Sequence, residues 1–248
     1  MTKTQKHPLV YLYDAATALN HIHKGEAQLM VGASVYLGKG VVWGQYAKLY
    51  EEVYCKQGKR ILREDGVLVV IQTNAYEDGE FICRYHGLCE LMFEWDWELV
   101  DERVWERKAA DHFQVPFSHV LVFRPPCGTA KRNQLNKRSK AWFQGIWRYR
   151  QTHGGELNSY PDELCRVLVE GCTDPGGLVV DPFAGTGALL RVACQLGRKA
   201  IGCELNPELL PTLLNNGCWV MDGKGHIQRP KEFEHTFGKR EPYGKKDK

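Results

Sequence analysis

The segment 181–187, which reads Asp-Pro-Phe-Ala-Gly-Thr-Gly, has the residue types and the position of a ligand-binding loop. It follows an apolar run and opens directly into a predicted amphipathic helix. Gly185 and Gly187 allow a tight turn and the close approach of a ligand, because glycine has no Cβ atom. The start of the helix adds unpaired N–H groups and the positive end of its dipole. The pattern therefore predicts a ligand at this turn.

The acidic residue Glu204 points to a nucleotide-like ligand. It ends the next predicted strand, roughly 20 residues beyond the loop, where a carboxylate binds a ribose in nucleotide-binding βαβ units. In the alternative interpretation these residues only pack, with Phe183 in the core, Asp181 as a helix cap and Gly185 as a packing glycine. The combination of strand, loop, helix and acid favours a cofactor site.

A second feature is a basic segment over residues 112–155. No Asp or Glu occurs between His112 and Gly155, and aromatic residues alternate with the cations. Such a segment suits the phosphates and bases of a nucleic acid. The alternative is a solvated basic surface, although a surface that serves only solubility normally mixes both signs. The expected DNA-binding residues are Arg124, Lys131, Arg132, Lys137, Arg138, Lys140, Arg148 and Arg150.

The hydrophobic pattern predicts an α/β fold that positions these residues. A hairpin-like edge of the sheet is expected from two β-rich runs, 98–107 and 119–123. Pro161 is expected at the first position of a helix. Further strands are predicted at Val10–Tyr13, Gln28–Val31, Val67–Ile71, Leu178–Asp181 and Lys199–Glu204, and further helices at Tyr46–Leu62, Glu80–Phe93, Thr186–Leu196 and Pro207–Leu214.

The composition predicts one domain over residues 1–222 and a basic, flexible tail over 223–248. The chain has 248 residues, of which 43% are hydrophobic, and a net charge of +3. The run 29–42 is too short and too broken to span a bilayer, and no secretory signal precedes it, so a cytoplasmic protein is expected. Nine irregularly spaced cysteines favour reduced core residues over disulfides or a metal site.

Several of these motifs together resemble the amino-methylating DNA methyltransferases, which modify N6 of adenine or N4 of cytosine, in their permuted arrangement with the cofactor loop near the C-terminus. The similarity covers most of residues 8–217. It is carried by 181–187 and by 197–207, which reads Gly-Arg-Lys-Ala-Ile-Gly-Cys-Glu-Leu-Asn-Pro. Tyr160-Pro161 resembles a helix start that closes over the cofactor, and Tyr13-Asp14 a strand end near its adenine.

The resemblance implies a Rossmann-like fold that binds S-adenosylmethionine. The sheet would be mostly parallel, with an antiparallel hairpin edge and a basic target-recognition insertion. DNA would be the substrate, and a homodimer or an active methyltransferase partner is considered as well. The implied cofactor-binding residues are Asp14, Pro161, Asp181, Phe183, Gly185, Thr186, Gly187 and Glu204.

The family's catalytic motif is degenerate in this chain. The motif is Asp, Asn or Ser, then two prolines and an aromatic residue that stacks on the flipped base. Its first residue accepts hydrogen bonds from the target amine, whose lone pair is otherwise delocalised into the ring. Alignment of 28–36 with this pattern places Ala33 at the accepting position, Ser34 at the first proline and Tyr36 at the stacking position. Alanine cannot accept that bond, although Ser34 substitutes for it if the loop is shifted.

Two interpretations follow from this defect. In the first, the chain is a DNA amino-methyltransferase, slow because its motif is degenerate. In the second, it is an inactive relative that binds cofactor and DNA as a recognition subunit or a blocker. Modification of RNA or protein, and transfer of a group other than methyl, are weaker alternatives.

Overall fold

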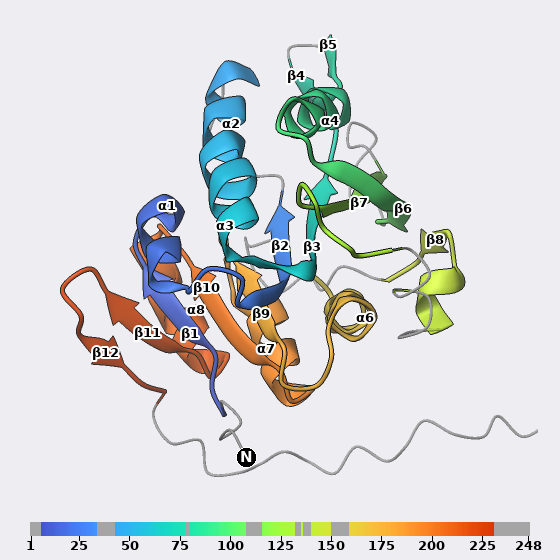
Figure 1. Cartoon of the computed structure of the whole chain (residues 1–248). Helices are drawn as coiled ribbons and strands as arrows, with labels where there is room; N and C mark the ends of the chain where they lie inside the picture. Colours follow the sequence, from blue (N-terminus) through green and yellow to red (C-terminus); the bar gives the residue numbers. More distant parts are fainter. Residues whose placement is uncertain are drawn as a thin grey trace, which may run out of the picture.

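The computed structural model describes residues 6–33, 43–77, 80–107, 116–131, 135, 140–149 and 159–230. Within these ranges the chain forms a ten-stranded sheet in the order β12-β11-β1-β10-β9-β2-β3-β7-β6-β8, and β4 and β5 form a separate pair (Figure 1). The strands of the large sheet are β1 Leu9–Leu12, β2 Ala27–Ala33, β3 Leu62–Gln72, β6 Glu98–Glu106, β7 Phe117–Arg124, β8 Ile146–Trp147, β9 Leu178–Asp181, β10 Lys199–Cys203, β11 Trp219–Asp222 and β12 Ile227–Gln228.

Helices cover both faces of this sheet. One buried cluster joins α6, α7 and α8 to one face, and a second joins α1, α2, the π-helix η2 and α4 to the other (Figure 1). Burial on both faces explains why β9 is apolar without alternation. The remaining elements are α1 Ala15–Ala18, η1 Leu19–His21, α2 Trp43–Tyr50, η2 Glu51–Gly58, α3 Lys59–Ile61, β4 Ala75–Glu77, β5 Glu80–Ile82, α4 Arg84–Glu94, η3 Lys140–Phe143, α6 Asp162–Cys172, α7 Ala188–Gln195, η4 Pro207–Leu209 and α8 Leu210–Asn215.

The topology creates a switch point between β9 and β2. The chain leaves β9 through α7 to reach β10 on one side, whereas β2 leads through α2, η2 and α3 to β3 on the other. All these strand pairs are parallel. Ligands of open α/β sheets bind at the carboxyl ends of strands at such a point. Ala33 and Asp181 end β2 and β9 there.

Most of the expected elements are confirmed, including the strand Leu178–Asp181 with its predicted bounds. The antiparallel pair is also confirmed as β6 and β7, but it is not the edge, because β8 pairs with β6. The helix expected from Glu80 begins only at Arg84, since 80–82 pair with β4 instead. Pro161 has extended backbone angles and precedes the first helical residue, Asp162, so its expected position was wrong by one residue.

The C-terminal part of the sheet extends past the expected domain boundary. β12 lies within 223–248 and pairs antiparallel with β11, while 231–248 fall outside the described residues. The division into one domain and a tail stays a prediction. Six of the nine cysteines are buried, which fits their expected place in the core. No helix of the described residues is long and apolar enough to cross a membrane.

Candidate cofactor and active site

A pocket of about 210 Å³ lies at the switch point between β9 and β2. The carboxyl ends of β2 and β9 contribute Ala33 and Asp181, and the loop after β9 contributes Phe183, Gly185 and Thr186. The far wall comes from β3, β6 and β7 and the segment before α6. The other residues that line the pocket are Ile71, Thr73, Trp105, Arg107, Ser118, Ser159, Tyr160, Ala184, Ala188 and Leu189.

The loop after β9 is fixed by the carboxylate of Glu204. The N–H groups of Gly185 and Asn206 each donate to it over 2.8 Å, and the N–H of Glu204 donates to the carbonyl of Tyr11 over 3.0 Å. These bonds join the ends of three neighbouring strands. The carboxylate therefore occupies a defined position at the edge of the sheet, with lone pairs left for a ligand's hydroxyl groups.

The two glycines of the loop have different surroundings. Both have positive φ angles, +54° for Gly185 and +77° for Gly187. A Cβ atom on Gly185 would have no neighbour nearer than the carbonyl of Phe183 at 4.0 Å, so this backbone lies open to a ligand. On Gly187 it would lie 2.9 Å from the Sγ atom of Cys218, so packing against the body of the protein requires this glycine. The open cradle at Gly185 fits a closely bound ligand.

Asp181 is a buried acid in the pocket. The pKa of this carboxyl is raised to about 7, because burial and, to a smaller extent, the nearby Glu204 outweigh the hydrogen bond donated by the Phe183 N–H over 3.1 Å. The carboxyl is therefore partly protonated near neutral pH. A cation bound in the pocket would favour its ionised form.

The other expected cofactor residues lie around this centre at different distances. The Thr186 hydroxyl shares a hydrogen bond of 2.9 Å with Ser159, which joins the loop to the segment before α6. Pro161 is buried beside Tyr160 but does not line the pocket. Asp14 follows β1, beyond β10, and caps α1 by accepting from the Thr17 N–H over 2.9 Å. The structure thus brings Asp14 to the side of Glu204, away from the pocket itself.

The expected catalytic loop is described only at its beginning. Ala33 lines the pocket, and its carbonyl accepts a hydrogen bond from the buried Tyr54 hydroxyl over 3.0 Å. Ser34 and Tyr36 lie outside the described residues. At the expected amine-accepting position the side chain is therefore a methyl group and the carbonyl already has a donor.

Sequence reasoning missed most of the far wall of the pocket. Thr73 and Ser118 share a hydrogen bond of 2.7 Å, and Trp105 packs edge-on against Tyr160 at 6.0 Å. Thr73 directly follows the strand predicted at Val67–Ile71, so the rule that ligands bind at strand ends could have found it. Trp105 and Ser118 come from the antiparallel strands β6 and β7, whose register no sequence motif predicts.

The described DNA-binding candidates divide between two places. Arg124 pairs with Glu98 at the end of β7, far along β3 from the pocket, and Lys131 follows the carbonyl of Ala130 that Arg124 also binds. Lys140 begins η3, and Arg148 follows β8 and pairs with Glu106 over 2.8 Å; β8 pairs with the part of β6 that carries Trp105. Only this second pair lies near the pocket wall. The remaining candidates, Arg132, Lys137, Arg138 and Arg150, lie outside the described residues.

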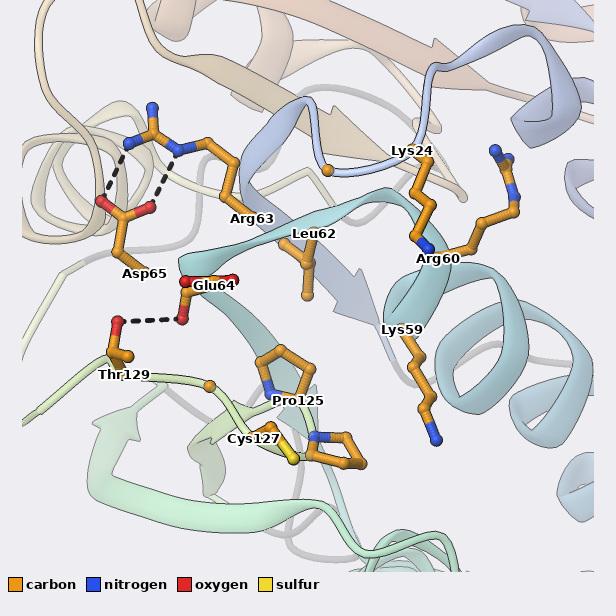
Figure 2. A pocket seen from close by; sticks show the side chains of 13 residues that line it. Lys24, Lys59, Arg60, Leu62, Arg63, Glu64, Asp65, Pro125, Cys127 and Thr129 are labelled. Atoms are coloured by element: carbon orange, nitrogen blue, oxygen red, sulfur yellow. Dashed lines mark hydrogen bonds and ion pairs between the residues drawn. The ribbon is translucent and has the colours of Figure 1, made fainter.

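A larger hollow of about 790 Å³ lies at the other end of the strands, by the amino ends of β2 and β3 (Figure 2). It is lined by the segment before β2, by α3 and the first residues of β3, and by the turn after β7. Arg60 donates to the carbonyls of Leu19 and Ile22 over 2.6 and 2.8 Å, and Arg63 is paired with Asp65. Arg60 thus holds α3 against the segment 19–22, whereas the Arg63 pair lies within β3, and we assign the hollow no ligand. The described residues also hold no group of three or more His, Cys, Asp or Glu that could bind a metal ion.

The sequence profile of a family of N6/N4 DNA methylases matches residues 44–215. The chain belongs to the N6/N4 DNA methylase family. The match includes the loop at 181–187 and Glu204, but it begins after Ala33 and the rest of the expected catalytic loop. The expected S-adenosylmethionine-dependent methyltransferase fold is confirmed, and the family's cofactor is the group that the pocket has to accommodate.

Curated relatives match over shorter stretches. The type II methyltransferase M.MjaI of Methanocaldococcus jannaschii is 36% identical over 78 residues, which are 29% of this chain and 26% of that protein. The M1.MboII enzyme of Moraxella bovis is 25% identical over 185 residues, 59% of this chain and 70% of that protein. The matched stretches thus span about a quarter of M.MjaI and more than two thirds of M1.MboII.

Solved structures of DNA methylases share the fold along most of the chain. A putative DNA modification methylase from Thermus thermophilus, complexed with S-adenosyl-L-methionine, has a TM-score of 0.74 at 20% identity and covers 88% of this chain and 100% of its own. The cytosine-N4-specific PvuII DNA methyltransferase has a TM-score of 0.73 at 16% identity and covers 86% and 87%.

Proposed function

We propose that the chain is an S-adenosylmethionine-dependent DNA methyltransferase that acts on an exocyclic amino group, N6 of adenine or N4 of cytosine. The observation that carries the proposal is the pocket at the switch point of an N6/N4 DNA methylase fold, with the open glycine turn at Gly185 and the fixed carboxylate of Glu204 at its edge. Family membership supplies the reaction class, and these residues supply a fitting site.

In this proposal each part of the pocket has a separate task. Glu204 accepts hydrogen bonds from the ribose hydroxyls, and the backbone at Gly185 lies against the cofactor. Asp181, when ionised, stabilises the positive charge of the methionine portion. When bound, the cofactor supplies an electrophilic methyl group. The far wall, with Trp105 and the hydroxyl pair of Thr73 and Ser118, receives the flipped base.

Ala33 keeps a second candidate function open, that of an inactive homologue that binds cofactor and DNA. At the expected position for polarising the amine, the described side chain carries no acceptor and the carbonyl already accepts from Tyr54. Loss of one well-placed hydrogen-bonding group commonly costs on the order of a hundred- to a thousand-fold in rate. The expected turnover of the natural sequence is therefore low under either candidate.

Mass spectrometry of nucleosides from DNA incubated with the protein and labelled cofactor tests the two candidates. N6-methyladenine or N4-methylcytosine would establish the enzyme and identify its base. The matched variant rebuilds Ala33-Ser34-Val35 as Asp-Pro-Pro and keeps Tyr36. Product only after rebuilding would favour the inactive homologue. Strong activity of the natural sequence that survives Ser34→Ala would show that another group activates the amine.

DNA binding is tested separately from catalysis. Because cations that contact phosphates release counterions, affinity for duplex DNA should fall steeply as salt rises. Charge reversal at Lys137 and Arg138 should weaken binding to every sequence about equally, as backbone contacts do. Unchanged affinity in that double variant would locate the DNA surface elsewhere, with the basic C-terminal segment as the next candidate.

A further inference from the structure

Tyr54 is a completely buried tyrosine that the proposed reaction does not use. It lies in the π-helix Glu51–Gly58, a type of helix that often occurs at functional sites. Its hydroxyl donates to the carbonyl of Ala33 over 3.0 Å. Burial raises the pKa of this hydroxyl well above its ordinary value, so it remains a donor at any working pH. It therefore holds the last described residue before the expected catalytic loop.

The ring of Tyr54 also contacts the cofactor side of the pocket. It packs edge-on against Phe183, with ring centroids 6.0 Å apart. Phe183 lines the pocket within the segment 181–187. One side chain thus contacts both the end of β2 and the loop after β9, although neither neighbour is near Tyr54 in the sequence.

The preceding helix, α2, extends this aromatic row to Trp43, the first described residue after 34–42. Tyr50 stacks on Tyr54 with centroids 5.0 Å apart, and Trp43 packs edge-on against Tyr50 at 6.1 Å. Both chain ends that flank 34–42 are therefore attached to one aromatic row. Gly32 shows how closely this row fits β2, because a Cβ atom there would collide with the Tyr54 hydroxyl.

We infer that Tyr54 is a positioning residue that couples the cofactor loop to Ala33 at the end of β2, through its ring on Phe183 and its hydroxyl on the carbonyl of Ala33. The inference rests on the proposed function. A ligand that contacts Phe183 stabilises one position of Tyr54, and hence one position of Ala33 in the lining of the pocket. Cofactor and DNA should then increase each other's affinity, because coupling between two sites is reciprocal.

The test measures the affinity for a duplex oligonucleotide with and without S-adenosylhomocysteine. In the natural sequence the ligand should tighten DNA binding at least about fivefold. We call the ratio of the DNA affinities with and without S-adenosylhomocysteine the mutual effect. Tyr54→Phe keeps the ring and removes only the hydroxyl, so the affinity for each ligand alone should stay within about twofold, while the mutual effect falls to about one. Where methyl transfer is measurable, kcat should fall about tenfold, as expected for one lost hydrogen bond. Tyr85→Phe, on α4, is the matched control and should leave the mutual effect unchanged.

A variant at the neighbouring ring separates positioning from simple stabilisation. As a single change, Phe183→Leu should also reduce the mutual effect, and it should add little to the loss in the Tyr54→Phe background, because the two changes interrupt successive contacts of the same path from Phe183 through Tyr54 to Ala33. Retained mutual effect in Tyr54→Phe, or its absence in the natural sequence while both ligands bind, would overturn the inference and leave the proposed function intact. Failure of the natural sequence to bind either ligand would overturn both.

Discussion

The surroundings of the Asp181 carboxyl bring its pKa close to neutral pH. Its folded pKa of about 7 lies above the ordinary value of 3.8 because the group is buried. A raised acid pKa means that the folded state prefers the protonated form. The stability contributed by this group is thus complete below about pH 4 and is lost as the pH rises through about 7.

Cofactor binding should reverse this preference and release protons. A cation in the pocket lowers the pKa of Asp181, so binding at pH 7 should release up to about half a proton per site. Calorimetry in two buffers of different ionisation enthalpy measures that number. Asp181→Asn should abolish the release and flatten the loss of stability between pH 4 and 7. Equal proton release by the variant and the natural sequence would show that another group titrates.

Individual residues were predictable where a short motif defines their geometry. The open turn at Gly185 and the acid at Glu204 followed from spacing alone, because a strand, a loop and a helix constrain both. Gly187 also belongs to the motif, but its contact with Cys218 arises from packing of distant segments. Tyr54 carries no motif, and only the folded chain shows that it contacts Ala33.

The elements that carry the basic segment are anchored by a buried polar network. Asp101 and Arg103 on β6 form a buried ion pair. The Trp142 indole N–H donates to Asp101 over 2.8 Å, and Arg103 donates twice to the Trp142 carbonyl. Trp142 is therefore fixed by both its side chain and its main chain. The next residue, Phe143, is 69% exposed.

This arrangement presents Phe143 to a partner from a rigid base. With Lys140 and Arg148 nearby in the chain, it has the mixture of ring and charge that binds nucleic acid. Phe143→Ala should weaken DNA binding by about 1–3 kcal/mol without changing the dependence on salt, since a ring contact releases no counterions. Lys140→Ala should instead reduce the salt slope by about 1.

Phe93→Ala provides the control for Phe143, because Phe93 is 52% exposed on α4, in a different part of the molecule. DNA affinity, measured by fluorescence anisotropy across a salt series, should be unaffected by this change. Equal losses from both phenylalanine variants would indicate a general effect of surface apolar residues, and would contradict a specific contact at η3.

Helices and strands were predictable where the hydrophobic periodicity is strong, and less predictable where strand pairing determines the structure. The apolar stripe of 46–62 predicts one helix and the structure has one continuous helical segment, but its central π-helical part follows from packing rather than from sequence. Residues 80–82 were expected to begin a helix yet pair with β4, because a strand partner close by in the chain satisfies their backbone. Phe81 and Ile82 also belong to types that are enriched in strands.

At the scale of the whole molecule, the pocket and the larger hollow lie at opposite ends of the strands of the large sheet. The pocket lies at the carboxyl ends of the parallel strands, and the hollow lined by Arg60 and Arg63 lies at their amino ends. The order of strands could not be derived from local patterns, because β1 from the N-terminus inserts between β10 and β11 from the C-terminus. The family's permuted arrangement predicted a mostly parallel sheet, and the pairing confirms it.

Because β1 lies between β10 and β11, a ligand bound at Glu204 interacts with strands from both ends of the chain. The Glu204 N–H donates to Tyr11 on β1, and its carboxylate holds Gly185 beyond β9, so a ligand on this carboxylate stabilises N-terminal and C-terminal strands together. At S-adenosylmethionine concentrations of about 100 times Kd, the free energy of unfolding should rise by about 2.7 kcal/mol. For a chain of this size each kcal/mol raises Tm by about 2–4 °C, so the expected shift is about 5–11 °C.

Removal of the Glu204 side chain should reduce that shift. Loss of charge-assisted ribose bonds costs about 1–3 kcal/mol of binding, so Glu204→Ala should need roughly 5- to 150-fold more ligand for the same Tm. Glu208→Ala removes the same charge from an exposed position in η4 and should keep the full shift. Thermal unfolding across a ligand series measures all three proteins, with calorimetry to supply Kd. An undiminished shift in Glu204→Ala would mean that the ribose is held elsewhere, and no shift in any of them at millimolar ligand would mean that this fold no longer binds its family's cofactor.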